Sequence, residues 1–148
     1  MSDTIKLVCG DCGTINQLFV ARLDQSPKCG ICQQTLFSGK PISVTSDRLI
    51  KHVENSGIPV LIDFWAPWCG PCLNFAPTYE AFAQSVGNQL RILKVDTEAN
   101  QQAGIDFNIR SIPTLALFLN GQEKGRMSGG IALPQLQQWV VNKLSADD

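Results

Sequence analysis

Residues 42–146 alternate between apolar runs and helical patterns in the way that a mixed α/β fold requires. Residues 59–65, PVLIDFW, are almost continuously apolar, which predicts a strand covered on both faces. Residues 70–86 place apolar side chains at a helical period, which predicts a long helix, and Pro77 inside it predicts a kink. Two further apolar runs, 90–95 and 114–119, predict buried strands.

Weaker patterns complete this part of the chain. They predict a strand at 42–44, a short helix around 49–53 that ends before Gly57, and a helix at 99–107. Asn120-Gly121 is a strong hairpin signal, so 122–128 should pair antiparallel with 114–119. A last apolar stripe predicts a closing helix over 133–144. The expected order is β-α-β-α-β-α-β-β-α, an α/β fold with a central mixed sheet flanked by helices.

The first 38 residues differ from this pattern. They hold two short strand-like runs, 6–9 and 17–21, and are too few to bury a self-sufficient core. Gly39-Lys40-Pro41 breaks both helix and strand patterns. We therefore predict a small module over 1–38, a linker over 39–41 and a second domain over 42–148.

Composition narrows the function classes. The chain has 148 residues, 44% of them apolar and 17% charged, with a net charge of −1, which is typical of a globular protein. The balanced charge argues against nucleic acid or an anionic membrane as partner. No stretch approaches the ~18 apolar residues of a membrane span, and the N-terminus lacks the features of a secretory signal. These features predict a soluble, cytoplasmic protein.

All six cysteines fall into three C-x-x-C pairs, and in a reducing compartment such pairs indicate metal binding or redox catalysis. Cys69 and Cys72 lie between the strand at 59–65 and the long helix. A cysteine at a helix N-terminus is stabilised as a thiolate, and the i,i+3 spacing lets the second thiol close a disulfide. The alternative is an inert, partly buried pair.

The other four cysteines, Cys9, Cys12, Cys29 and Cys32, match the spacing of a four-cysteine zinc site. Four thiolates complete a tetrahedral shell and leave no open position, so such a site would be structural. Gly10, Gly13 and Gly30 favour tight turns around it. Two alternatives stay open, namely extra redox dithiols that pass electrons to Cys69, and iron in the same cage.

The motif WAPWCGPC, preceded by VLIDFW and followed by IPTLALF and NG, resembles the thioredoxin family over residues 42–146. With the four N-terminal cysteines, the chain resembles the zinc-carrying thioredoxin-2 type of bacteria. Two residues depart from the commoner pattern: Pro67 before the motif tryptophan, and Leu73 where a lysine often follows the second cysteine. Leu73 removes a positive charge near the thiolate.

The resemblance implies roles for further residues. Asp63, a carboxylate in an apolar strand, would accept the proton of Cys72, and Lys94 would neighbour it; the alternatives are a solvent-facing aspartate and a plain surface lysine. The Ile112-Pro113 bond would be the family's cis-proline bond. The expected substrate-binding rim consists of Trp68, Ile112, Pro113 and Gly129, whereas Trp65 is expected in the core.

His52, the only histidine, is expected on the solvated side of a short helix.

The function implied by the resemblance is that of a protein disulfide reductase, re-reduced by a flavin-dependent thioredoxin reductase with NADPH. It would keep cytoplasmic proteins reduced and donate electrons to reductive enzymes. Its cofactors would be one structural Zn²⁺ and the redox-active disulfide, with no organic cofactor, and the chain would act as a monomer. The alternative is a zinc-dependent binding module or holdase. Gly70-Pro71 and the missing export signal argue against an oxidase or isomerase.

Overall fold

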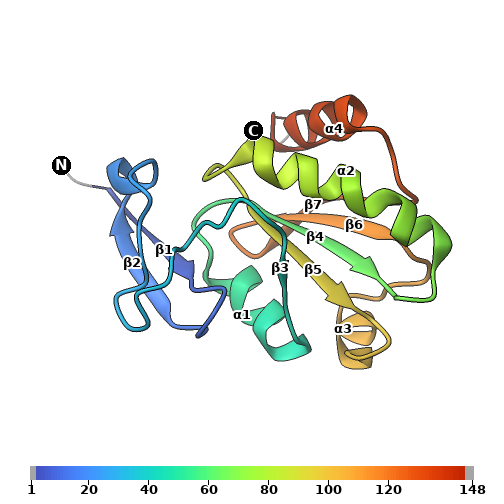
Figure 1. Ribbon diagram of the computed structural model, residues 1–148, viewed down its shortest axis with the longest axis horizontal. Helices are drawn as coiled ribbons and strands as arrows, with labels where there is room; N and C mark the ends of the chain where they lie inside the picture. The colour runs from blue at the N-terminus through green and yellow to red at the C-terminus, as the bar shows by residue number, and fades with distance from the viewer. Residues whose placement is uncertain (1–2, 146–148) are drawn as a thin grey trace.

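A computed structural model describes residues 3–145 (Figure 1), and its largest part is a five-stranded sheet between two layers of helices. The sheet order is β3-β5-β4-β6-β7, with β3, β5 and β4 parallel and β6 and β7 antiparallel to their neighbours. The strands are β3 (Ile42–Ser43), β4 (Val60–Trp65), β5 (Arg91–Asp96), β6 (Thr114–Leu119) and β7 (Gln122–Ser128). The helices are α1 (Ser46–Asn55), α2 (Gly70–Val86), α3 (Gln101–Asp106) and α4 (Leu133–Ser145).

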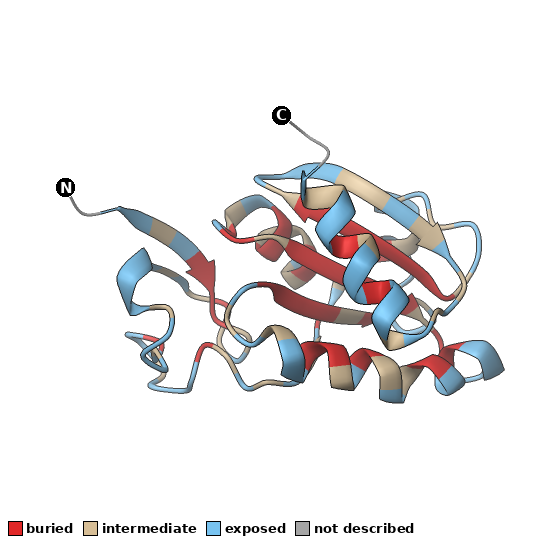
Figure 2. Cartoon of the chain, turned by 90° about the horizontal axis from the view of Figure 1, so that it is seen from above, coloured by how far each residue is buried: buried red, intermediate tan, exposed pale blue. Residues whose placement is uncertain are grey.

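Each face of this sheet has its own core. Alternate residues of β4 point to opposite faces. Val60, Ile62 and Phe64 pack on the side of α1 and α3, while Leu61 packs against α2 and α4. Both clusters consist of buried residues, and the strands that carry most of them are coloured red in Figure 2. This two-sided burial explains why the apolar runs are continuous rather than alternating.

Residues 4–19 form a separate two-stranded antiparallel sheet of β1 (Thr4–Val8) and β2 (Ile15–Phe19), followed by a short 3-10 turn, η1 (Val20–Arg22). Its own buried cluster contains Leu7, Leu36, two cysteines and Ile58, the last of which follows α1. The small sheet lies at one end of the long axis of the molecule, and the N-terminus of α2 lies at the other (Figure 1).

Arg91 joins the two parts. It begins β5, is only 1% exposed, and directs its guanidinium into the small module. There Nη2 donates to the carbonyl of Val8 at 2.6 Å and Nη1 donates to the carbonyl of Leu36. The same guanidinium lies 5.2 Å from the ring centroid of Phe37. One buried cation therefore links the end of β1 and the segment around Leu36 to the central sheet.

The order of elements predicted for residues 42–146 is confirmed, and α2, β6 and β7 have the predicted bounds. The two N-terminal strands begin two residues earlier than predicted, and the helix predicted at 99–107 is shorter, because Asp96 Oδ1 accepts the amides of Glu98 and Ala99 in a turn before it. No helix within residues 3–145 is long and apolar enough to cross a membrane.

The prediction for His52 is wrong. His52 is fully buried, on the face of α1 that also carries Leu49 and Val53. Leu49 and Val53 belong to the core of the central sheet, so this face of α1 points inward, and α1 also contacts β1 of the small module. Burial, followed by the charge of Arg91, lowers the pKa of His52 to about 3, so the imidazole is neutral.

Candidate active site and metal centre

Cys69 and Cys72 form a disulfide at the N-terminus of α2. Their Cα atoms are 5.2 Å apart, within the usual range for a bridge. Cys69 is the N-cap residue, and its Sγ accepts the amide of Cys72 at 3.2 Å. Pro71 lies in the first turn, where a missing amide costs nothing. This position brings a helix dipole and an amide donor to Cys69 Sγ, both of which favour its thiolate after reduction.

Of the four residues expected at a substrate rim, Trp68 and Ile112 lie beside this disulfide, and Gly129 is bonded to Pro113. Trp68 is 69% exposed beside it, and the carbonyl oxygen of Ile112 lies 3.8 Å from Cys69 Sγ. The Ile112–Pro113 bond is cis, and the Pro113 carbonyl accepts the amide of Gly129 at 2.8 Å. Ile112 is half-buried and packs on the two cysteines. The disulfide is thus bordered by an exposed indole and by the main-chain segment just before β6, which is bonded to the residue just after β7.

Asp63 lies in β4 on the face that α2 covers. It shares its side with Leu61, which packs on Tyr79 of α2, and Tyr79 follows Cys72 by two helical turns. The carboxylate is 4% exposed, and its Oδ1 has no hydrogen-bond partner within residues 3–145. Burial raises the pKa of Asp63 to about 7, against a smaller lowering by Lys94. At neutral pH this carboxyl group is therefore divided between its two protonation states.

Lys94 lies beside Asp63 in the register of β4 and β5. Its Nζ is 4.5 Å from the ring centroid of Trp65, so the ammonium group stacks on the indole face. Trp65 is half-buried and packs with Cys69 and Cys72. Lys94 is thus a neighbour of the buried carboxylate, and Trp65 belongs to the packing beneath the disulfide.

The four N-terminal cysteines converge into one cluster. All four Sγ atoms lie within 4.8 Å of one another. The Cys9–Cys32 and Cys12–Cys29 Sγ distances are both 3.6 Å. A tetrahedral site with Zn–S bonds of about 2.3 Å requires sulfur atoms about 3.8 Å apart. The cluster therefore fits zinc in both donor type and size.

The two halves of this cluster repeat the same turn. The amide of Asp11 approaches Cys9 Sγ at 3.4 Å, and the amide of Ile31 approaches Cys29 Sγ at 3.4 Å. Four residues after each first cysteine the chain is left-handed, at Gly13 (φ 79°) and at Gln33 (φ 69°). Only the first of these positions has the glycine that this conformation favours.

Polar groups near the cluster favour the thiolate of Cys29, whereas burial and the neighbouring cysteines raise the pKa of Cys32. The amides of Cys32 and Ile31, together with the Asn16 side chain, lower the pKa of Cys29 to about 6. Asn16 Nδ2 lies 3.5 Å from Cys29 Sγ, while its Oδ1 accepts the amide of Gly30 at 2.9 Å. These donors stabilise the negative charge that metal-bound sulfur carries.

Sequence reasoning missed two residues. Asn16 joins the two turns of the cysteine cluster, and its sequence neighbours give no sign of this. Arg91 carries a charge within an apolar strand, an unusual position that could have singled it out, although not its targets.

Comparisons with known proteins agree with this arrangement. The family model described as thioredoxin matches residues 40–142, and the model described as the N-terminal zinc ribbon of thioredoxin 2 matches residues 8–34. Thioredoxin C-3 of Corynebacterium nephridii is 40% identical over 138 residues, covering 93% of this chain and 94% of that protein.

Two other matches are informative. A bifunctional thioredoxin reductase/thioredoxin of Mycobacterium leprae is 42% identical over 92 residues, which are 62% of this chain and 20% of that protein. The crystal structure of thioredoxin from Malassezia sympodialis superposes with a TM-score of 0.61 at 31% identity, covering 68% of this chain and 88% of that one.

Proposed function

Because this chain belongs to the thioredoxin family of thiol–disulfide oxidoreductases, we propose that it is a protein disulfide reductase that works as a monomer in a reducing cytoplasm. The observation that carries the proposal is the Cys69–Cys72 disulfide at the start of α2, bordered by an exposed tryptophan. The redox chemistry would reside in a domain over 42–148, joined by a linker at 39–41 to a zinc module over 1–38.

In the first step, the reduced form presents Cys69 as the nucleophile. Its thiolate attacks one sulfur of a substrate disulfide, a mixed disulfide forms, and the other substrate sulfur leaves as a thiolate. Trp68, Ile112, Pro113 and Gly129 would hold the substrate segment against the reacting sulfur. The position of the Ile112 carbonyl, 3.8 Å from Cys69 Sγ, supports a substrate strand that runs alongside it.

In the second step, Cys72 resolves the mixed disulfide. Its thiolate attacks Cys69 Sγ, the substrate leaves with its second sulfur as a thiolate, and the Cys69–Cys72 bond closes. The two electrons thus pass to the substrate. Asp63 would take the Cys72 proton, because a pKa of about 7 lets a carboxylate accept a proton at neutral pH and release it again.

Turnover requires a supply of two electrons to reopen the disulfide. We assign this role to a flavin-dependent thioredoxin reductase that uses NADPH. The Mycobacterium leprae relative, in which one chain is named for both activities, supports this partner. The reduced dithiol would then serve oxidised cytoplasmic proteins and enzymes that consume reducing equivalents.

The second component of the proposal is one structural Zn²⁺ held by Cys9, Cys12, Cys29 and Cys32. The metal would link the two turns of the module and supply folding free energy rather than chemistry at a substrate. The sulfur cluster and the match to a zinc ribbon support this assignment.

Trapping tests the catalytic assignment. Cys72→Ser should accumulate mixed disulfides with oxidised proteins in a cell extract, because Cys69 attacks and nothing resolves the product. Cys69→Ser is the matched control and should accumulate none. Non-reducing electrophoresis with mass spectrometry of the adducts measures both, and adducts on Cys72 in the Cys69→Ser variant would reverse the two roles.

A further inference from the structure

The small module has a free strand edge. β2 pairs only with β1 among the described strands. Hydrogen bonds from Val20 to Asp3 and from Cys9 to Thr14 fix which residue pairs of this ladder are bonded. By alternation, the main-chain groups of Gln17 and Phe19 point away from β1. Their counterparts on β1 do the same on the other side, where the Lys6 carbonyl accepts the amide of Gly57.

This edge lacks the usual protection. Proteins normally shield a free strand with charged side chains, proline or a bulge. The sequence of β2 is INQLF, which offers neither charge nor proline, and its register with β1 has no bulge. Ile15 and Phe19, on one face of the strand, are 40% and 44% exposed. A strand of this kind pairs readily with another extended chain.

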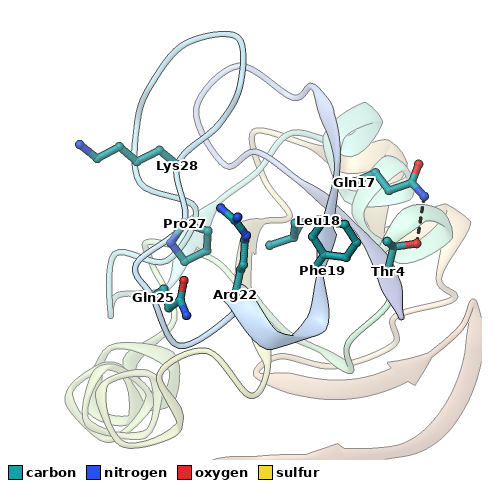
Figure 3. A pocket seen from close by; sticks show the side chains of 8 residues that line it. All are labelled: Thr4, Gln17, Leu18, Phe19, Arg22, Gln25, Pro27 and Lys28. Carbon is teal, nitrogen blue, oxygen red and sulfur yellow. Dashed lines mark hydrogen bonds between the residues drawn. The ribbon is translucent and has the colours of Figure 1, made fainter. Parts of the chain in front are cut away.

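A hollow of about 580 Å³ runs along the same edge, within the size range of binding pockets. Residues from both faces of β2 line it, Gln17 and Phe19 from one and Leu18 from the other, and Thr4 of β1, which accepts a hydrogen bond from Gln17, lines it as well. Its opposite wall consists of Arg22, Gln25, Pro27 and Lys28, and Figure 3 shows Arg22 between Pro27 and β2.

The charged side chains that line the hollow are all positive. Arg22 and Lys28 line it and no acidic residue does. Neither cation forms a salt bridge within the described part of the chain. An extended occupant with an acidic side chain would form an ion pair with Arg22 or Lys28 while its main chain adds to the ladder.

We propose that the free edge of β2 and this hollow bind an extended, acidic segment of a partner protein as an added strand. Main-chain bonds to Gln17 and Phe19 supply the affinity, Phe19 packs on the segment, and Arg22 with Lys28 selects a carboxylate. This site goes beyond the proposed reductase function and does not depend on it. It lies at the end of the molecule opposite the disulfide (Figure 1), so a partner can be held there without blocking Cys69.

The test selects ligands without assuming their sequence. Full-length, zinc-loaded protein is used to select from a display library of random ten-residue peptides that lack cysteine, so that thiol exchange cannot capture them. The selected peptides are labelled and their binding is measured by fluorescence anisotropy. We expect enriched sequences that alternate β-branched or aromatic residues with at least one Asp or Glu.

Two protein variants locate the binding. Gln17→Pro removes an amide that points away from β1, so it should weaken binding about tenfold or more, while zinc content and free-thiol count stay unchanged. Gln17→Thr, the matched control, changes the side chain but keeps the amide and should bind normally. Arg22→Glu should weaken acidic peptides and favour versions in which the acid is replaced by lysine.

A peptide variant keeps the test independent of protein folding. Every second amide of an added strand faces β2. N-methylation of these amides should abolish binding, whereas N-methylation of the amides between them should leave binding unchanged. The proposal is overturned if no sequence is enriched, if Gln17→Pro binds as well as Gln17→Thr, or if N-methylation affects binding equally at every position. It is also overturned if β2 instead pairs two copies of this chain, which concentration-dependent dimerisation lost in Gln17→Pro would show.

Discussion

Asp63 combines a cost to stability with the catalytic role proposed for it. Its carboxyl group is buried under α2 with an unpartnered Oδ1, and its pKa rises from 3.8 to about 7. Such a residue disfavours the folded state once it is ionised, yet it is suited to exchange protons at neutral pH.

We predict that Asp63→Asn raises the free energy of unfolding at pH 8. The folded state binds the Asp63 proton more tightly than the unfolded state, so stability falls as the pH rises from 3.8 to about 7 and is constant above that. A pKa rise of that size corresponds to as much as about 4 kcal/mol. Urea titrations at a series of pH values measure it, and an equal pH dependence in wild type and variant would contradict the burial cost.

The same variant should be slow in resolving mixed disulfides. Losing the proton acceptor should reduce that step by about tenfold or more at neutral pH, while attack by Cys69 should change less. Rapid-quench measurement of the mixed disulfide separates the two steps. A wild-type rate and pH profile for resolution would remove Asp63 from the mechanism.

Among the helices and strands, β5 is joined to the module by the side chain of Arg91. We predict that Arg91→Met loosens the module, because the carbonyls of Val8 and Leu36 lose their buried donors, at about 1–3 kcal/mol for each unsatisfied group. Protease cleavage around residues 39–41 and zinc loss to a chelator should both accelerate. Intact-mass spectrometry follows the cleavage.

Arg22→Met is the matched control for this prediction. Arg22 is an exposed arginine of the same module, so its replacement should leave both rates unchanged. Arg91→Lys should be intermediate, because an ammonium group can reach one carbonyl but not fork between two. Equal cleavage rates in Arg91→Met and Arg22→Met would mean that other contacts hold the module.

The sequence predicted most elements because each has a local cause. The continuous runs of β4 and β6 follow from burial on two faces, and Asn120-Gly121 places the turn before β7. By contrast, the burial of His52 depends on how α1 is placed on the core of the central sheet. The bonds from Arg91 to Val8 and Leu36 arise only when the module meets β5, which is distant in sequence. The cysteine spacing predicted the sulfur cluster, whereas Asn16 joins it through the fold of the module.

In the molecule as a whole, we expect disulfide reduction to be independent of zinc binding. We predict that deleting residues 1–38 removes about one zinc per chain and retains most disulfide reductase activity, because the five-stranded sheet has its own two cores. The truncated protein should be less stable, since Ile58 and Arg91 lose their covering. Metal analysis, insulin reduction and thermal unfolding give the three readouts.

Thiol counting on the intact protein supplies the complementary check. After mild reduction, only Cys69 and Cys72 should react readily in the zinc-loaded protein, and all six cysteines should react once the metal is chelated. Six equally reactive thiols and no metal in the purified protein would end the zinc assignment.

Because the Arg91 guanidinium is buried, the rate of its chemical modification reports how often the module detaches from the sheet. Dicarbonyl reagents modify arginines that they can reach, and Arg22, Arg110 and Arg126 are exposed to them from the start. Arg91 is covered by Val8, Leu36 and Phe37, so its adduct can form only while the module is lifted from the sheet. The rate at which the Arg91 adduct forms therefore measures how often the module separates from β5, without any mutation.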